Sequence, residues 1–474
     1  MWTKTVYSGL WLVYFYAFVM CILFSGLSHD IKADDLNGGE KVFLTLEEAI
    51  ATALLNNNQI KSSGYSLNKA NWDVKNAWSQ LIPTLSLNSR FTKIDEQTFA
   101  ERDFRRYLPA EFADQIPQTV FQESYYTSFD VTLPVFNGAI ITGIRIANSG
   151  EEMAEHMNNS TRQNIIFQVV NTYLNVLKAK EVVGIQKQYL ELSQLNFEKA
   201  ERMYEADRYS KSDVLRWKVD YQTQRGNLVN SESMLRSTTI ALYRLLNMDM
   251  NKNVEIVGQL SDKLLDDSKK LSELSEQDIL TMINLTEDEL VQSNSALAAA
   301  KANATMSEKM HSGSYLNYLP NVSFSYSHAW RENGTLGLDD YSPKTAMLNF
   351  QMPIFSGFQN VTKSKSTYYD YKKSQEDFAD QMNNTRYILT ETVNKILNLK
   401  VQKELSKTNV EYTERNYRVV ETQKEKGLVS NIDFVDAKLN LQNAQLTDVH
   451  NQYDFIIAMV ELYYMLGKID SLVE

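Results

Sequence analysis

The sequence predicts a fold that combines very long α-helices with transmembrane β-strands in two tandem repeats. Only 7 prolines occur in the 474 residues, and none lies within residues 135–319 or after residue 353. Because a proline inside a helix costs about 3 kcal/mol, both stretches can hold long helices. Each stretch follows the same motif, Leu133–Gly138 in one case and Met352–Gly357 in the other, with prolines 219 residues apart (353 − 134). A fixed offset kept over a long span indicates an internal duplication.

Four segments alternate apolar and polar side chains with a period of two residues. These predicted strands cover about residues 84–93, 124–134, 321–331 and 345–355. Their length fits a tilted membrane strand, and aromatic residues are frequent on the apolar face. A soluble sheet with one buried face has the same pattern, so a single strand leaves both interpretations open.

The order of the strands favours the membrane. They come in two pairs, prolines mark one end of each strand, and helical stretches flank each pair on the proline side. A polar loop joins each pair at the other end. We therefore expect all helices on one side of the sheet and both loops on the other, which is the polarity of an outer-membrane barrel.

Long helices are predicted over residues 138–207, 211–248, 357–426 and 431–466. Their apolar residues form only a narrow stripe with a spacing of three or four, for example Ile166, Val170, Tyr173 and Leu177. An antiparallel coiled coil explains such a stripe. Helices that line water and contact their neighbours along a thin seam explain it equally well.

The first 28 residues are predicted to be a signal peptide. The apolar run from Leu10 to Phe24 is shorter than the ~20 residues that a transmembrane anchor needs. The rest of the chain divides into a first repeat at residues 29–250 and a second repeat at residues 281–474. The acidic segment 251–280 between them is expected to form a small side domain of short elements.

The composition excludes several functional classes. The net charge is −11 and no basic cluster occurs, so nucleic acid is not an expected partner. The only cysteine, Cys21, lies in the predicted signal peptide, which leaves the mature chain without thiol chemistry. The five histidines form no metal-binding pair, and no P-loop, G-x-S-x-G or G-x-G-x-x-G motif is present. We expect no catalytic residue, no metal and no cofactor, and hence no enzyme.

The turn after each long helix carries a repeated polar motif. In the second repeat, Gly427 can adopt the left-handed conformation that ends a helix, and Ser430 with Asp433 has the spacing of a capping box. The corresponding pair in the first repeat is Ser210 and Asp213. Stabilisation of a helix N-terminus is by itself a sufficient explanation for both aspartates.

Asp436 is different because it lies one turn beyond Asp433, on the same helical face, where capping no longer explains it. Gly427 and Asp436 have no equivalent in the first repeat, where Asp207 and Arg216 stand. Two stacked carboxylates, repeated around a symmetric oligomer, would form two acidic rings. Such rings attract cations and obstruct anions.

These features together resemble the TolC-type outer-membrane efflux proteins. The resemblance covers Leu44 to Leu466 and rests on the tandem repeat, the strand starts Ile82–Leu87 and Leu319–Phe324, the two Pro-φ-Phe-x-Gly junctions and the Asp-φ-φ-Asp-Ala sequence at 433–437. It implies a homotrimer. Each protomer would contribute four strands to a 12-stranded β-barrel and its helices to a long periplasmic α-helical barrel.

The resemblance also implies roles for residues at the tip. The paired aspartates of the family line the periplasmic constriction of the closed channel, and they correspond to Asp433 and Asp436. Asp213 corresponds to the acid that helps to hold the tip shut. Its usual arginine and tyrosine partners are replaced by Val429 and Lys424, so Lys424 remains as a second latch candidate.

The function implied by the resemblance is a passive exit duct of a tripartite efflux or type I secretion system. It would sit in outer-membrane lipid with its helices in the periplasm, and an inner-membrane pump would supply the energy. A periplasmic adaptor is expected to open the duct by docking on the helix tips, at Arg208, Tyr209, Ser210, Gly427, Leu428, Val429 and Ser430. The alternative is an exported coiled-coil envelope protein without a channel, which explains the helices but not the paired aromatic strands.

Overall fold

The computed structural model describes residues 42–113, 115–249, 254–257, 262–332 and 342–472. The predicted signal peptide lies outside the described residues. The chain divides into two compact units. Of the described residues, the smaller comprises Val42–Phe43 and Val254–Glu255, and the larger comprises the rest. The sheet and the long helices described below belong to the larger unit.

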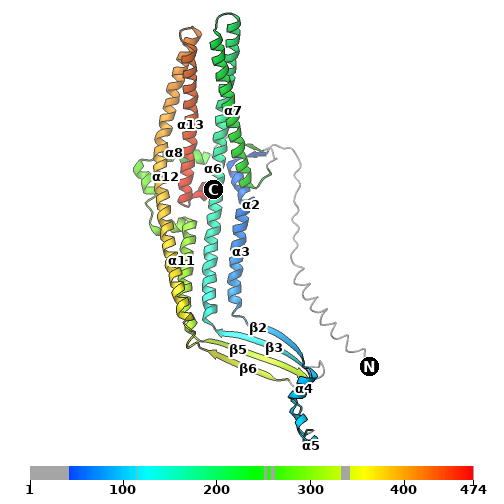
Figure 1. The fold of residues 1–474 in the computed structure, drawn as a ribbon. Helices are drawn as coiled ribbons and strands as arrows, with labels where there is room; N and C mark the ends of the chain where they lie inside the picture. The colour runs from blue at the N-terminus through cyan, green and yellow to red at the C-terminus, as the bar shows by residue number, and fades with distance from the viewer. Residues whose placement is uncertain (1–41, 114, 250–253, 258–261, 333–341, 473–474) are drawn as a thin grey trace. The chain divides into compact units, whose positions relative to one another are not determined.

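One antiparallel sheet contains the four predicted strands in the order β2-β3-β5-β6 (Figure 1). Their bounds are Thr84–Lys93, Glu123–Phe136, Asn321–Glu332 and Lys344–Gln351. The register places Leu85 opposite Val131, Val131 opposite Tyr326 and Tyr326 opposite Ala346. Since these positions alternate with polar ones, the four apolar faces combine into one continuous apolar face.

That apolar face is exposed in the single chain. Leu87 on β2 is 60% exposed and Phe350 on β6 is 66% exposed, and every residue of these two outer strands is exposed. A soluble sheet would bury its apolar face against a core. The structure therefore excludes the soluble-sheet interpretation for β2 and β6 within this chain.

All four junctions between strands and helical segments lie at the same end of the sheet. The first residue of β2, Thr84, pairs with Thr132 near the end of β3, and the first residue of β5, Asn321, pairs with Gln351 at the end of β6. The connections β2–β3 and β5–β6 therefore leave from the opposite end. This arrangement agrees with the expected polarity of helices and loops.

The expectation that every helix lies on one side of the sheet is wrong. The β2–β3 connection contains α4 (Glu96–Arg102), the 3₁₀ helix η1 (Phe104–Tyr107) and α5 (Ala110–Ala113). The Asp95 carboxylate accepts a hydrogen bond from the Thr98 amide at 2.8 Å and so caps α4. Sequence reasoning took this polar segment for a loop, because helices of one or two turns have too little periodicity to detect.

The two strand-to-helix junctions differ although their sequences match. In the first repeat, β3 continues through Pro134 to Phe136, with a register shift between these two residues. In the second, β6 ends at Gln351 instead of the expected residue 355. A turn follows, with Gly357 and Phe358 at φ +61° and +65°. β3 is an inner strand with a hydrogen-bonding partner on each side, whereas β6 is an outer strand with one partner. The second partner explains why β3 continues through its proline and β6 does not.

The long helices are α6 (Gly138–Glu205), α7 (Lys211–Leu246), α12 (Gln359–Glu425) and α13 (Asn431–Met465). α6 has 68 residues, which at 1.5 Å per residue is about 100 Å. Each helix ends one or two residues before the expected position, and α12 begins two residues later. Within the described residues no helix is both long and apolar enough to cross a membrane.

Four shorter helices precede the strand pairs and were not assigned from the sequence. They are α2 (Leu46–Asn56), α3 (Asn58–Ser79), α10 (Glu287–Ser293) and α11 (Ser295–Ser314). An asparagine separates the two helices of each pair and caps the second one. The side-chain amide of Asn57 also donates to the Leu245 carbonyl at 2.8 Å, and that of Asn294 donates to the Met465 carbonyl at 3.0 Å. The two acceptors are 220 residues apart (465 − 245), so the duplication extends to these caps.

The segment between the repeats contains short elements, as expected. They are β4 (Val254–Ile256), which pairs with β1 (Val42–Leu44), and the helices α8 (Asp262–Glu273) and α9 (Glu276–Met282). The 3₁₀ helices η2 and η3 span Tyr315–Tyr318 and Ile469–Leu472. The core lies along α6, which contacts α3, α7, α11 and α13. The predicted stripe is confirmed, because its four residues are all buried: Ile166, Val170, Tyr173 and Leu177.

Candidate functional site at the helix tips

The turns α6–α7 and α12–α13 have the same backbone conformation. Asp207 adopts a left-handed φ of 56°, as Gly427 does at 74°. The amide of Arg208 donates to the Met203 carbonyl at 2.9 Å, and the equivalent bond of the second repeat, from Leu428 to Gln423, measures 2.8 Å. Both turns are therefore helix C-caps with a left-handed residue. Gly427 and Asp207 thus differ in residue type but not in backbone conformation, because an aspartate tolerates the left-handed region.

Both predicted capping boxes are present. The Asp213 amide donates to the Ser210 hydroxyl at 3.2 Å, and the Ser210 amide donates back to the Asp213 carboxylate at 3.1 Å. The pair Ser430 and Asp433 repeats this geometry at 3.2 Å in each direction. Hydrogen bonds from the two serines hold the pKa of both carboxyl groups below the usual range. Each aspartate thus stabilises a helix N-terminus, whatever else it does.

Asn431 joins the two tips in a way that sequence reasoning missed. Its side-chain amide donates to the Asp213 carboxylate at 2.7 Å, and its side-chain carbonyl accepts a hydrogen bond from the Lys424 ammonium. The two latch candidates are therefore connected through a third residue and not by a direct ion pair. The only sequence signal was a polar residue at the first position of α13, a common feature that predicts no partner.

The environment of Lys424 is partly desolvated. Its ammonium group lies 5.9 Å from the centre of the Tyr209 ring, a cation–π distance. Burial lowers the pKa of Lys424, the Asp213 carboxylate counteracts that shift, and Lys199 adds to it. Burial and the nearby Asp213 carboxylate together raise the pKa of Tyr209. The cross-tip contact thus couples a carboxylate, an amide, an ammonium and an aromatic ring.

Asp433 and Asp436 lie on the exposed face of α13. The opposite face carries Phe434, which is buried in an apolar cluster with Ala200 and Trp217. This cluster fixes the rotation of α13 against the first hairpin. Since Asp433 and Asp436 are one turn apart on the other face, both carboxylates remain at the surface of the protomer.

The residues expected to dock an adaptor are mostly exposed. Leu428 is 71% exposed. Tyr209 and Val429 are half-buried, and the remaining four are exposed: Arg208, Ser210, Gly427 and Ser430. The two turns therefore offer a mixed apolar and polar surface.

A buried ion pair connects the two hairpins below the tips. The ammonium of Lys438 on α13 donates to the Asp220 carboxylate on α7 at 2.5 Å and to the Ser193 hydroxyl on α6 at 2.8 Å. The Lys438 side chain is 0% exposed and the Asp220 side chain 6% exposed. Burial lowers the pKa of Lys438, and its contact with Asp220 acts in the opposite direction.

A second polar layer lies one turn further along α13. The Gln442 amide donates to the side-chain carbonyls of Gln186 at 2.9 Å and Gln224 at 2.8 Å. Gln224 returns a bond to Gln442 at 3.0 Å. Such layers fix the register between helices, because a slip would leave buried polar groups without partners.

The family model of outer membrane efflux proteins matches residues 49–248 and 286–468. These two segments make up most of the chain and coincide with the two halves of the duplication. The chain belongs to the outer membrane efflux protein family. The comparison with curated protein sequences found no match.

Solved structures of outer-membrane channels share the fold of this efflux protein. The CmeC outer membrane channel of Campylobacter jejuni has a TM-score of 0.77 at 14% identity, covering 90% of this chain and 86% of that chain. VceC, an outer membrane protein of Vibrio cholerae, has a TM-score of 0.74 at 16% identity, with coverages of 89% and 96%. The open state of the Neisseria gonorrhoeae MtrE outer membrane channel has a TM-score of 0.71 at 14% identity, with coverages of 90% and 89%.

The comparisons confirm three of the predictions. The fold class is that of the efflux proteins, with a helical barrel part and transmembrane strands built from a tandem repeat. The function is that of an outer-membrane efflux channel, and its location is the outer membrane. The alternative of a coiled-coil envelope protein without a channel is not favoured. The family and its structural relatives are channel proteins and not enzymes.

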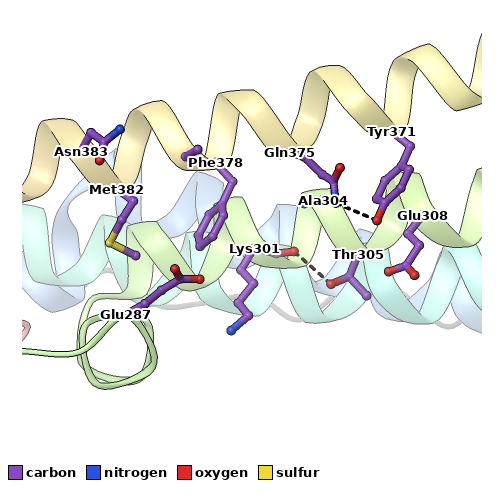
Figure 2. A pocket seen from close by; sticks show the side chains of 11 residues that line it. Glu287, Lys301, Ala304, Thr305, Glu308, Tyr371, Gln375, Phe378, Met382 and Asn383 are labelled. Atoms are coloured by element: carbon purple, nitrogen blue, oxygen red, sulfur yellow. Dashed lines mark hydrogen bonds between the residues drawn. The ribbon is translucent and has the colours of Figure 1, made fainter.

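A hollow lies between α11 and α12 (Figure 2). It encloses about 440 Å³, and no serine, cysteine or histidine lines it. Two of its ionisable groups have structural partners: Lys301 pairs with Asp288 at 3.1 Å, and the Tyr371 hydroxyl accepts a hydrogen bond from Gln375 at 2.7 Å. Among the described residues no group of three or more histidine, cysteine, aspartate or glutamate side chains could hold a metal ion.

Proposed function

We propose that three copies of this efflux protein close into one passive exit duct, with the helix tips as its gate. The observation that carries this proposal is the incomplete sheet. β2 and β6 are outer strands, and each has one edge without a strand partner in the described chain. Four strands cannot close a barrel, since outer-membrane barrels start at about 8 strands, whereas three copies provide 12 (4 × 3).

The two faces of the sheet support this closure. The apolar face would contact outer-membrane lipid, and the polar face would line the water-filled interior. On the polar face, Asp130 accepts hydrogen bonds from Asn88 at 2.8 Å, Ser128 at 2.7 Å and Ser327 at 2.5 Å. A carboxylate that accepts hydrogen bonds from its own strand and from both neighbouring strands suits a wet lumen and would be costly in lipid.

At the tips, Asp433 and Asp436 from three protomers would form two acidic rings at the periplasmic constriction. Their position on the exposed face of α13, opposite the Phe434 cluster, supports this placement. Asp433 would have two roles, because it also caps its helix. The rings would hold cations and slow the passage of anions through the closed duct.

The cross-tip contacts would hold the closed state. Asp213 and Lys424 act as the latch through Asn431, and the buried Lys438–Asp220 pair fixes the two hairpins below it. A periplasmic adaptor that docks on the exposed turns, including Leu428, would shift the equilibrium to the open state. The inner-membrane pump of a tripartite efflux or type I secretion system would supply the energy.

Two measurements test this proposal. Protein from the outer-membrane fraction is run on a detergent gel with and without boiling, and we expect a trimer that boiling converts to a monomer. A monomer in both lanes contradicts the closure. In planar bilayers, multivalent cations should block the wild-type channel, and the double change Asp433→Ala and Asp436→Ala should weaken that block. Asp207→Asn, at the other tip, is the matched control, because asparagine removes the charge and tolerates the left-handed conformation of this residue. Equal effects would refute the acidic constriction.

A further inference from the structure

A second polar hollow lies at the end of the sheet farthest from the helix junctions. It encloses about 720 Å³ and is formed by the ends of β2, β3 and β5 together with the β2–β3 connection. Its polar lining includes Arg90, Arg102, Arg331, Thr92, Ser124 and Tyr126. Neither the tip gate nor the closure of the sheet uses these residues.

Two of the arginines are placed by the strand register. Arg90 on β2 pairs with Tyr126 on β3, and Tyr126 pairs with Arg331 on β5, so the three residues form one row across the sheet. The Arg331 guanidinium lies over the Tyr126 ring at 5.9 Å. The row lies on the polar face, two residues along β2 from Asn88, and Arg102 joins it from α4.

The charges of the hollow are unbalanced. Three arginines line it, and no carboxylate of a described residue does. Two acids close by in the chain have other partners: Glu123 pairs with Lys93 at 2.7 Å, and Asp103 pairs with Arg105 at 2.7 Å. Guanidinium groups converging on a polar hollow are the chemistry that binds oxyanions, because each can donate two parallel hydrogen bonds.

We propose that this arginine hollow binds small water-soluble oxyanions with two or more negative charges, such as phosphate or phosphorylated and polycarboxylated solutes. A lipid phosphate has the same chemistry. Geometry favours the soluble source, since the row lies on the polar face and lipid would contact the apolar one. The hollow is formed within one protomer, so binding does not require the closure proposed above. In the closed trimer, three such hollows would place a basic zone at the opposite end from the acidic tips.

Binding can be measured by calorimetry on the full-length protein in detergent, with inorganic pyrophosphate as the probe. The variants are Arg90→Gln, Arg331→Gln and the double change. We expect the double change to weaken binding by about tenfold or more. Arg331→Lys should weaken it less, because lysine keeps the charge and loses the paired donors. Circular dichroism and the unboiled gel show whether each variant is folded.

Lys93→Gln is the matched control. It removes one positive charge from the same end of β2, but from the opposite face, and should change pyrophosphate affinity less than twofold, about the effect of a distant screened charge. Equal pyrophosphate affinity in wild type and the double variant would overturn the proposal. Equal losses of affinity in the double variant and the Lys93→Gln control would also overturn it. So would a wild-type protein that does not bind pyrophosphate at concentrations up to roughly 10 mM. Anionic lipid that is retained by wild type and lost in the double variant, seen by native mass spectrometry, would overturn the assignment to soluble anions.

Discussion

Replacing Lys438 by methionine tests whether the buried ion pair holds the two helical hairpins together. Methionine keeps a similar length and removes the ammonium group, so Asp220 and Ser193 lose their shared donor. The Asp220 carboxylate would then remain in an environment where it is only 6% exposed. Full hydration of this carboxylate requires local opening of the contact between α7 and α13.

The expected magnitude follows from this burial. Removing one partner of a buried ion pair costs about 3–5 kcal/mol, mostly because the other charge stays desolvated. At 1.36 kcal/mol per factor of ten, the open population of this region should rise between about 150-fold and 5,000-fold. Replacing both partners, with Lys438→Met and Asp220→Leu, removes both desolvation costs. The double variant should therefore be close to wild type or more stable.

Hydrogen–deuterium exchange of the purified protein measures this opening directly. Peptides from α6, α7 and α13 around the ion pair report local opening, while the long helices remote from it serve as an internal reference. Lys218→Met is the matched control, since Lys218 occupies the equivalent place in the first repeat (438 − 220) and is exposed. Exchange that rises less than about tenfold in Lys438→Met, or a double variant as labile as the single ones, would refute the reasoning.

Three further predictions concern the tip and the sheet. Asn431→Ala should increase the separation of spin labels placed on the two turns, whereas Lys211→Ala, at the equivalent place of the first repeat, should leave it unchanged. Hydrogen bonds from Ser210 and Asn431 lower the pKa of Asp213 in the folded protein. Its ionised carboxylate therefore stabilises the closed tip at any pH above the unfolded-state pKa near 3.8, and this contribution is lost as the pH falls through the folded-state pKa. The label separation should thus stay constant from neutral pH to about pH 4 and rise only below it. Leu87→Arg, near the middle of β2, should destabilise the assembled protein in the membrane by about 2–4 kcal/mol, and Asn88→Arg, on the opposite face, by much less. Equal losses of the heat-modifiable trimer on a gel would contradict the assigned faces.

Local patterns in the sequence determined much of this protein. The alternation of residues such as Leu85 and Leu87 with polar neighbours predicted each strand face, because a strand exposes its residues with a period of two whatever its partners. The absence of proline and the spacing of Ile166 and Val170 predicted the long helices and their buried stripe. The serine–aspartate spacing predicted both capping boxes, which form between residues three apart in the chain.

Short or non-local features could not be predicted in this way. The helices of the β2–β3 connection are too short for a periodic signal. The different courses of the matching motifs at Pro134 and Pro353 depend on how many neighbours each strand has in the sheet. Since a neighbouring strand is a property of the assembled sheet, similar local sequences can differ in conformation.

The tertiary structure alone decided which polar residues meet. Lys438 and Asp220 are 218 residues apart in the chain, as are Asn431 and Asp213. The periodicity of the sequence does not predict that Lys438 is fully buried, because its partner Asp220 lies on the other hairpin. The repeat offset of 220 does not mark it either, since these contacts join non-equivalent positions. The sequence by itself thus determined the helices, the strand faces and the duplication, through interactions between near neighbours. The packing of one hairpin against the other decided the charged contacts that hold the tips together.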